Sequence, residues 1–436
     1  MACELAPAGG FLMAEIADGV RFFARRSDKF KTLTLGGFIH RLLARETVTA
    51  TALAAQLLKR GCRKYPSTRA LAKRTEELYG AFIDSYVKKF GESQSIGVSL
   101  SVVDRAYLPG RPLGVLDAAI NLFLEVMTDP VTDDGGFHRP YFEQERENLR
   151  RRIMGMIDDK QRYARYRCLE EMCRGEGYGL LELGRLEDLP GLDPISVHEE
   201  FERILTGMPV DLIAVGPVDP IELTRRLADH IPKTVGSRAS VRAVSAAPPP
   251  PEPREVIEEQ DVKQGKLVMG FRTGILQDDP AYPALLGYNG VLGGFVHSKL
   301  FQNVRERASL AYYAQSVVNG AKGFVVIELG IDPENYGRAR EIIATQLAEI
   351  RRGQISDYEF ESTKKALQNV IRQSEDDPSD IIAIQLAEAQ SGRFKTVDDR
   401  LREISGLTRA DIVEVAGRVT LDTVYFLRGR RGGDGR

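Results

Sequence analysis

The amino-acid sequence predicts an α+β fold that is duplicated once, so that the chain forms two homologous lobes. Two observations support this prediction. A proline-rich break divides the chain into halves of similar size, and the same order of strands and helices occurs on each side of it. The length agrees with two lobes, because 436 residues exceed what one hydrophobic core usually organises.

The break lies at residues 237–258, which read SRASVRAVSAAPPPPEPREVIE. The prolines at 248–251 favour an extended polyproline conformation and exclude a helix or a central strand. We therefore expect residues 1–236 to form an N-terminal lobe, residues 237–258 to form a linker, and residues 259–436 to form a C-terminal lobe. A surface loop within one domain is the alternative interpretation.

Apolar periodicity predicts the elements of each half. In the first half we expect strands at 19–28, 33–42 and 96–103, and helices at 49–60 and 113–127. In the second half we expect strands at 266–274 and 324–331, and helices at 282–292 and 336–351. Long polar helices open at Tyr141 and Tyr358, and apolar strands at 210–215 and 423–427 end the two halves. The shared order of these elements indicates an internal repeat.

The charge balance is nearly even, with 60 basic and 62 acidic residues. It provides no basic field that would favour nucleic acid or an anionic membrane, and we expect neither as a partner. A helix needs about 18 or more consecutive apolar residues to span a bilayer, and the sequence contains no such run. The opening MACELAPA has an early acid and no basic segment, so we expect no signal peptide and a cytoplasmic location.

The four cysteines are Cys3, Cys62, Cys168 and Cys173. Their spacing fits no disulfide framework. Cys168 and Cys173 lie five residues apart, which is neither a C-x-x-C motif nor half of a zinc site. We expect reduced structural thiols, as is usual in the cytoplasm.

Several motifs resemble those of the insulinase/pitrilysin family of metallopeptidases. Residues 298–312, SKLFQNVRERASLAY, follow Leu-Gly-Gly at 292–294 and resemble the signature of that family's second domain. The sequence SEDDP at 374–378 fits the same pattern. In the first half, RGCRKYP at 60–66 and LYG at 78–80 resemble the segment after the family's catalytic helix. The resemblance covers nearly the whole chain, and the block around Arg305 is its most specific part.

A narrower resemblance concerns ETVTATALAAQLLKRG at 46–61, followed by RKYPSTRAL and EELYGA. These segments resemble a zinc-less bacterial subgroup of the family, which is associated with zinc-bearing relatives and with modification of translation elongation factor P. The resemblance implies two lobes that close like a clam shell around an extended peptide. Each lobe would be a mostly antiparallel sheet backed by helices.

Active members of the family carry an H-x-x-E-H motif, whose two histidines bind zinc and whose glutamate activates the bound water. A downstream glutamate is the third ligand. Here the motif positions hold Ala52, Ala55 and Gln56, and the third-ligand position falls near Arg151 or Arg152. An arginine repels zinc. We therefore expect no bound metal, no cofactor and no catalysis by the chain alone.

No other catalytic constellation is evident. No two of the five histidines form a helical i, i+4 pair, and we interpret them as surface or hydrogen-bonded interior residues: His40, His138, His198, His230 and His297. The chain also lacks a G-x-S-x-G nucleophile elbow and a P-loop.

Four residues remain as candidates for substrate binding. The resemblance implies that Arg305 and Tyr312 hold the carbonyl and the backbone of a peptide near the zinc. They lie seven residues apart, which on an uninterrupted helix places both on one face. The alternative is that Arg305 pairs with a neighbouring carboxylate and Tyr312 only packs. Gly293 and Gly294 either let backbone approach a ligand closely or form an ordinary turn.

The sequence thus favours a non-catalytic subunit of a heteromeric zinc peptidase. Such a subunit pairs with a zinc-bearing homologous subunit and helps to enclose and bind an extended peptide. The alternative is a stand-alone peptide-binding or scaffold protein, homodimeric if it has no partner, that assists a modifying enzyme or the maturation of a peptide. In either case an exposed strand edge in each lobe can accept a peptide by β-addition.

Overall fold

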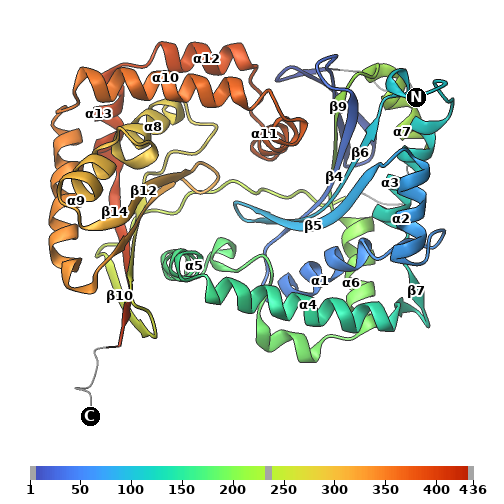
Figure 1. Cartoon of the computed structure of the whole chain (residues 1–436), viewed down its shortest axis with the longest axis horizontal. Helices are drawn as coiled ribbons and strands as arrows, with labels where there is room; N and C mark the ends of the chain where they lie inside the picture. The colour runs from blue at the N-terminus through green and yellow to red at the C-terminus, as the bar shows by residue number, and fades with distance from the viewer. Residues whose placement is uncertain (1–5, 231–237, 431–436) are drawn as a thin grey trace. The chain divides into compact units, whose positions relative to one another are not determined.

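Figure 1 shows the computed structural model of the chain, which describes residues 6–230 and 238–430. Cys3, the first linker residue Ser237 and the side chain of His230 lie outside the described part. The chain forms two compact units. Unit 1 comprises residues 1–154, 180–243 and 374–396, and unit 2 comprises residues 155–179, 244–373 and 397–436. Each unit therefore contains a segment from the other half of the chain.

The sheet of unit 1 has seven strands in the order β1-β2-β3-β9-β4-β6-β5. Their bounds are β1 Ala6–Ala8, β2 Phe11–Ala17, β3 Val20–Arg26, β9 Val210–Gly216, β4 Thr32–Leu42, β6 Ser93–Val103 and β5 Phe82–Phe90. Neighbouring strands are antiparallel except β3 and β9, which are parallel. One edge of this sheet is β5. A small hairpin of β7 Thr132–Asp133 and β8 Gly136–Phe137 forms a separate pair.

Helices lie on both faces of the unit 1 sheet. They are α1 Val48–Leu58, α2 Thr68–Glu77, α3 Val115–Thr128, α4 Arg139–Asp158, α6 Pro194–Gly207, α7 Pro220–His230 and α11 Pro378–Ser391. Short 3-10 turns occur at η1 Arg105–Tyr107 and η3 Leu186–Gly191. All eleven residues of α1 are buried, as expected for a helix that is apolar on every side.

α11 covers one face of the unit 1 sheet although it comes from the second half of the sequence. Ile381, Ile382, Leu386 and Ala389 of α11 form one buried cluster with side chains from the sheet, which include Phe11, Phe23, Phe38, Ile213 and Val215. The core of unit 1 is therefore complete only when residues 374–396 are present.

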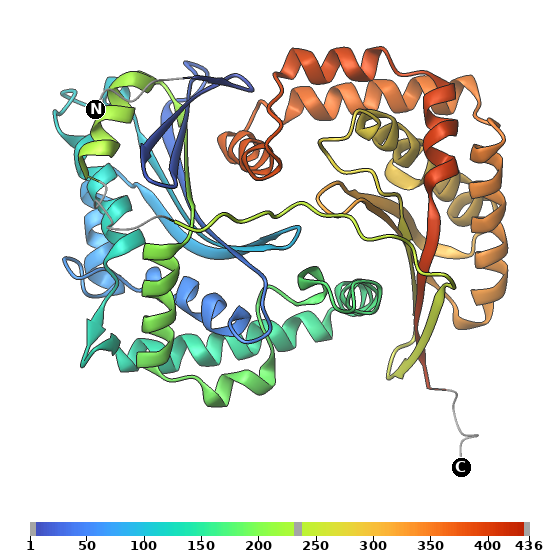
Figure 2. The same ribbon diagram turned by 180° about the vertical axis from the view of Figure 1, so that it is seen from behind.

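The sheet of unit 2 has five strands in the order β10-β14-β11-β13-β12. Their bounds are β10 Arg254–Gln260, β14 Thr420–Gly429, β11 Gly265–Arg272, β13 Phe324–Ile331 and β12 Ala311–Asn319. Only β10 and β14 are parallel neighbours. β10 begins within the predicted linker, and residues 238–253 before it form an extended trace (Figure 2). The predicted division into an N-terminal lobe, a linker at 237–258 and a C-terminal lobe stays a prediction.

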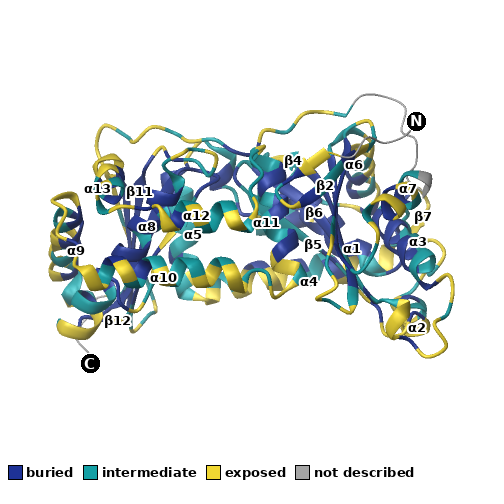
Figure 3. Cartoon of the chain, turned by 90° about the horizontal axis from the view of Figure 1, so that it is seen from above, coloured by how far each residue is buried: buried dark blue, intermediate teal, exposed yellow. Residues whose placement is uncertain are grey.

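The helices of unit 2 are α5 Lys160–Met172, α8 Tyr282–Asn289, α9 Tyr336–Arg351, α10 Asp357–Gln373, α12 Val397–Ser405 and α13 Arg409–Arg418. Two π-helical turns, η4 Gly290–Gly294 and η5 Phe301–Arg307, and the 3-10 turns η2 Gly177–Gly179 and η6 Pro333–Asn335 complete it. Figure 3 shows the sheet strands largely buried and exposed residues along α9 and α10. No helix among the described residues is long and apolar enough to cross a membrane.

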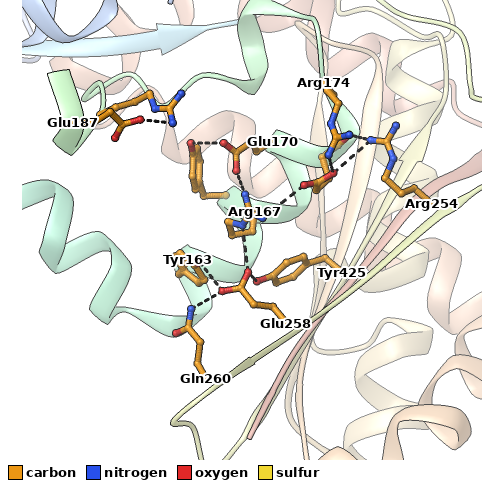
Figure 4. A network of polar contacts seen from close by, with 12 residues as sticks. Tyr163, Arg167, Glu170, Arg174, Glu187, Arg254, Glu258, Gln260 and Tyr425 are labelled. Carbon is orange, nitrogen blue, oxygen red and sulfur yellow. Dashed lines mark hydrogen bonds and ion pairs between the residues drawn. The ribbon is translucent and has the colours of Figure 1, made fainter. Parts of the chain in front are cut away.

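α5 comes from the first half of the sequence and packs on the sheet of unit 2. Ala164, Cys168 and Met172 of the helix share a buried cluster with side chains of the sheet, among them Val268, Phe324 and Leu427. A polar network flanks this contact (Figure 4). Glu258 accepts hydrogen bonds from the hydroxyls of Tyr163 and Tyr425, each at 2.7 Å.

The network around Glu258 also perturbs the acidity of its members. Burial opposes ionisation of Glu258, but the hydrogen bonds from Tyr425, Tyr163 and Gln260 and the charge of Arg167 together outweigh burial and lower its pKa. Burial and the bond to Glu258 raise the pKa of Tyr163 to about 12. Both effects keep the carboxylate charged and the phenol neutral near pH 7, which is the state in which the phenol donates.

The α+β prediction is confirmed, with a mostly antiparallel sheet backed by helices in each unit. The predicted strand at 324–331 and helix at 336–351 coincide with β13 and α9. The predicted helix at 282–292 differs, because it is α-helical only to Asn289 and continues as the π-helical turn η4.

The described cysteines are interior residues. Cys62, Cys168 and Cys173 are all buried, and none of them forms a disulfide within residues 6–230 and 238–430. Burial raises the pKa of the Cys62 and Cys168 thiols, which keeps them protonated and unreactive.

Candidate functional site

The positions of the predicted zinc motif lie inside unit 1. Ala52 and Ala55 are 0% exposed and Gln56 is 1% exposed, all on α1. The hydroxyl of Ser85 on β5 donates to the carbonyl of Ala55 at 2.6 Å, which fixes the helix against the sheet. Alanine offers no ligand atom, and a neutral amide such as Gln56 is not a usual zinc ligand.

The predicted third-ligand position lies on the surface. Arg151 and Arg152 are exposed on α4, and the Nε atom of Arg151 donates to Glu147 at 2.9 Å. The buried carboxylate of this helix is Glu145, which accepts from Nε of Arg60 at 2.5 Å. Across the described residues, no three His, Cys, Asp or Glu side chains gather as a metal site. The residues at the motif positions therefore do not fit a zinc ion.

Arg305 lies in unit 2 near the end of the π-helical turn η5. Its side chain is 42% exposed, and the nearest carboxylate is Glu306 at 3.7 Å. The guanidinium lies 4.6 Å from the centroid of the Phe301 ring, a cation–π geometry that supports the side chain beside its ion pair with Glu306. The Phe301 ring thus supports the side chain of Arg305, which remains partly exposed to solvent.

Tyr312 lies on β12 and is 66% exposed. The pairing of β12 with β13 shifts between Ala311 and Tyr313, which places Tyr312 at a β-bulge. A bulge re-aims a side chain relative to the regular alternation of the strand. η5 and β12 pack against each other within unit 2, so the elements that carry Arg305 and Tyr312 are neighbours.

Arg305 and Tyr312 do not lie on one uninterrupted helix, so their seven-residue spacing does not place them on one helical face. η5 ends at Arg307, and Ser309 has a φ of 50°, which is left-handed and stops the helix. The chain then enters β12 at Ala311.

Gly293 and Gly294 occupy the last turn of η4, next to β12. A Cβ atom on Gly293 would lie 2.7 Å from both the backbone N and the Oγ of Ser316, so only glycine permits this approach of helix and strand. Gly293 is buried, whereas Gly294 is exposed. Of the two backbones, that of Gly294 is the one presented to solvent.

A buried polar row across the unit 1 sheet was missed by the sequence analysis. Asp211 on β9 accepts from Nε and Nη2 of Arg21 on β3, at 2.8 and 2.9 Å. Oδ2 of Asp211, which accepts from Nη2 of Arg21, also lies 3.1 Å from Nε2 of His40 on β4. Nδ1 of His40 contacts Oγ of Ser95 on β6 at 2.7 Å. Four adjacent strands are thus joined by one chain of side-chain contacts.

Ser95, His40 and Asp211 have the residue types of a hydrolase triad. They are only 1%, 3% and 0% exposed, so a substrate carbonyl has no access to the hydroxyl. We interpret these contacts as structural: they fix the order and the register of the four strands. The signal for it in the sequence was Asp211, a lone charge inside the apolar strand VDLIAVG.

Burial opposes ionisation of Asp211, but the hydrogen bonds and charges of His40 and Arg21 outweigh burial and lower its pKa. A cavity of about 290 Å³ adjoins the row, where Arg21, His40 and Gln390 contribute to its lining. The carboxylate of Asp211 therefore stays ionised in the interior of unit 1 at neutral pH, with the guanidinium of Arg21 as its counter-charge.

Comparison with known proteins agrees with these observations. Residues 196–367 match the family model described as peptidase M16 inactive domain. The chain is 34% identical to the probable inactive metalloprotease YmfF of Bacillus subtilis, over 93% of this chain and 95% of that protein. It is 25% identical to the uncharacterized zinc protease YmxG of Bacillus subtilis, over 67% and 71% of the two chains.

A crystal structure of a conserved protein from Enterococcus faecalis V583 has a TM-score of 0.91 with this chain. That protein is 29% identical, and the match covers 98% of this chain and 100% of the other. Both the sequence and the fold are thus shared along nearly the whole length. The chain belongs to the peptidase M16 family, the insulinase/pitrilysin peptidases.

Proposed function

We propose that this chain is a non-catalytic subunit of a heteromeric zinc peptidase in the cytoplasm. It pairs with a zinc-bearing homologous subunit and helps to bind an extended peptide. One contrast carries the proposal: Ala52, Ala55 and Gln56 are buried and offer no usual zinc ligand, whereas Arg305 and Tyr312 stay exposed. The similarity to a domain and a relative described as inactive supports the absence of catalysis.

The exposed pair suits recognition of a peptide. The guanidinium of Arg305 presents a planar fork of donors, and the hydroxyl of Tyr312 is a further donor. Both can donate to peptide carbonyls or to an oxyanion that develops at the partner's zinc. The exposed backbone of Gly294 permits close approach of a ligand. The zinc-bearing subunit would supply the activated water.

Each sheet also offers an open edge for an extended peptide. β5 ends the sheet of unit 1, and β12 ends the sheet of unit 2. Among the described residues, the backbone of β5 forms hydrogen bonds with β6 and with no other segment. Unpaired backbone groups at an edge add a peptide strand through main-chain hydrogen bonds.

Affinity capture of the tagged chain from its native cells tests this function. We expect recovery of a partner of similar size that carries H-x-x-E-H, with about one zinc per pair. Zinc is measured in the eluate. Recovery of zinc-free chain alone would contradict the proposal, as would chelator-sensitive hydrolysis of unfolded peptides by the purified chain.

In the captured complex, Arg305→Ala should lower kcat/KM for a peptide substrate by about 10- to 100-fold, because it removes charged donors to the substrate. Tyr312→Phe should give a smaller decrease through loss of one hydroxyl. Arg307→Ala is the matched control, since Arg307 lies on the same turn and its Nη1 donates to Asn303 at 3.0 Å. Equal effects of Arg305→Ala and Arg307→Ala would assign Arg305 a structural role.

A stand-alone peptide-binding or scaffold protein is the second candidate. The open edges of β5 and β12 favour it, because β-addition needs no catalytic partner. Such a protein would present a substrate, for example translation elongation factor P, to a modifying enzyme, or would assist maturation of a peptide. Capture of the chain as a zinc-free homodimer, or together with a modifying enzyme, would favour this function.

A further inference from the structure

The edge strand β5 carries an ordered set of side chains on one face. Asp84, Tyr86 and Lys88 alternate along the strand, so they project from the same side of the sheet. On the inner side, the residues opposite them on β6 are small: Ser99, Gly97 and Ser95, in the same order. The outer side of β5 has no neighbouring strand in unit 1.

Tyr86 is fixed between the two charges. A Cβ atom on Gly97 would lie 2.7 Å from its ring, so the ring lies directly over that glycine. Tyr86 also packs against the buried cluster that contains Phe38. The aromatic ring therefore forms a constant apolar surface, with a carboxylate on one side and an ammonium group on the other.

Neither charged side chain has a partner among the described residues. The side chains of Asp84 and Lys88 form no hydrogen bond or ion pair with residues 6–230 or 238–430. Ser95, which is opposite Lys88, is occupied by its contact with His40 at 2.7 Å. Burial lowers the pKa of Lys88, and no acidic neighbour offsets this effect. A partly buried cation without a partner is costly, and a carboxylate from a ligand would reduce that cost.

Lys89 shows the contrast on the other face of the same strand. Its Nζ atom donates to the carbonyl of Leu180 at 2.9 Å and lies 3.7 Å from Glu182. The part of the chain that the structure describes thus provides partners for the side chain of Lys89 and none for that of Lys88.

Building on the proposed peptide-binding function, we propose that β5 selects the peptide strand that it binds by charge. The peptide carries an acidic residue opposite Lys88, an apolar residue opposite Tyr86 and a basic residue opposite Asp84. Antiparallel addition, the commoner strand pairing, gives the order acidic-x-apolar-x-basic from the amino to the carboxyl end. Directly opposite side chains lie close enough for opposite charges to attract and like charges to repel.

Two fluorescent peptides of equal composition test this inference with the full-length chain. One has the order acidic-x-apolar-x-basic, and the other has the two charges exchanged. Fluorescence anisotropy should show about tenfold tighter binding of the first peptide, because two favourable pairs replace two unfavourable ones. The difference should decrease with added salt, since these groups are partly exposed.

Exchange of the charges on the protein provides the decisive variant. The double variant Asp84→Lys/Lys88→Asp should invert the preference between the two peptides, whereas Lys89→Asp should leave it unchanged. Lys88→Met, which keeps the length of the side chain, should reduce the preference without inverting it. Inversion is a result that a purely structural role of these residues does not produce.

The outcomes separate this inference from the proposed function. Equal binding of the two peptides by the wild-type chain would overturn charge selection while peptide binding stands, and so would a preference that the exchanged variant retains. Binding of neither peptide, by the chain alone or in its captured complex, would overturn the proposed function and this inference with it.

Discussion

Replacement of Asp211 by alanine should lower the free energy of unfolding by about 3 kcal/mol, because it removes one partner of a buried ionic network. Asp211 is 0% exposed. It accepts two hydrogen bonds from Arg21, and its Oδ2 atom lies 3.1 Å from Nε2 of His40. Its loss leaves a guanidinium and an imidazole without their acceptor in the sheet. Denaturant unfolding followed by circular dichroism measures the change.

The pH dependence of this variant provides an independent check. The folded-state pKa of Asp211 is lowered from 3.8, so its stabilisation is present above that value and is lost as the pH falls through the folded pKa. The difference in stability between wild type and Asp211→Ala should therefore begin to narrow as the pH falls below about 4 and decrease further in stronger acid. Asp28→Ala, which breaks the exposed pair between Arg26 and Asp28, should change stability by less than about 0.5 kcal/mol. A gap that persists unchanged in acid would contradict the network as its cause.

The two halves of the chain, residues 1–243 and 244–436, should not fold when they are produced as separate polypeptides. The first half lacks α11, whose Ile381, Ile382 and Leu386 are buried against the unit 1 sheet. Each such side chain contributes about 1.5–3 kcal/mol when buried. The second half lacks α5, which covers part of the unit 2 sheet. We expect each half alone to aggregate or to show no cooperative unfolding.

Cleavage between the two halves should have little effect once the protein has folded. A protease site placed at prolines 248–251, which are exposed or half-buried, would divide the chain within the predicted linker. The two pieces should still elute together in size-exclusion chromatography, because each piece contributes a helix to the core of the other's unit. Separation of the pieces under native conditions would show that the exchanged helices do not hold the units together.

The elements that the sequence predicted correctly have a strong local signal. β13 is an apolar run that only Glu328 interrupts, and α9 shows helical periodicity with a clear end. The exchange of α5 and α11 had no such signal, because an amphipathic helix shows which face is buried but not which sheet buries it. Only tertiary packing decides that.

The sequence suggested which residues form the candidate site, but it did not predict their arrangement in space. The resemblance placed Arg305 and Tyr312 in one block, but it could not show the left-handed Ser309 or the bulge at Tyr312. The row of Asp211, His40 and Ser95 joins residues far apart in the sequence, and strand register alone brings them together.

The origin of α11 also affects how the protein is made on the ribosome. One apolar face of the unit 1 sheet cannot be covered until residues 374–396 have been synthesised, which happens long after residue 243. At about 5–20 residues per second, that interval is roughly 8–30 s. During this time Phe23, Phe38 and Ile213 lack the cover that α11 provides. We therefore expect the nascent protein to expose an apolar sheet face to which a chaperone can bind.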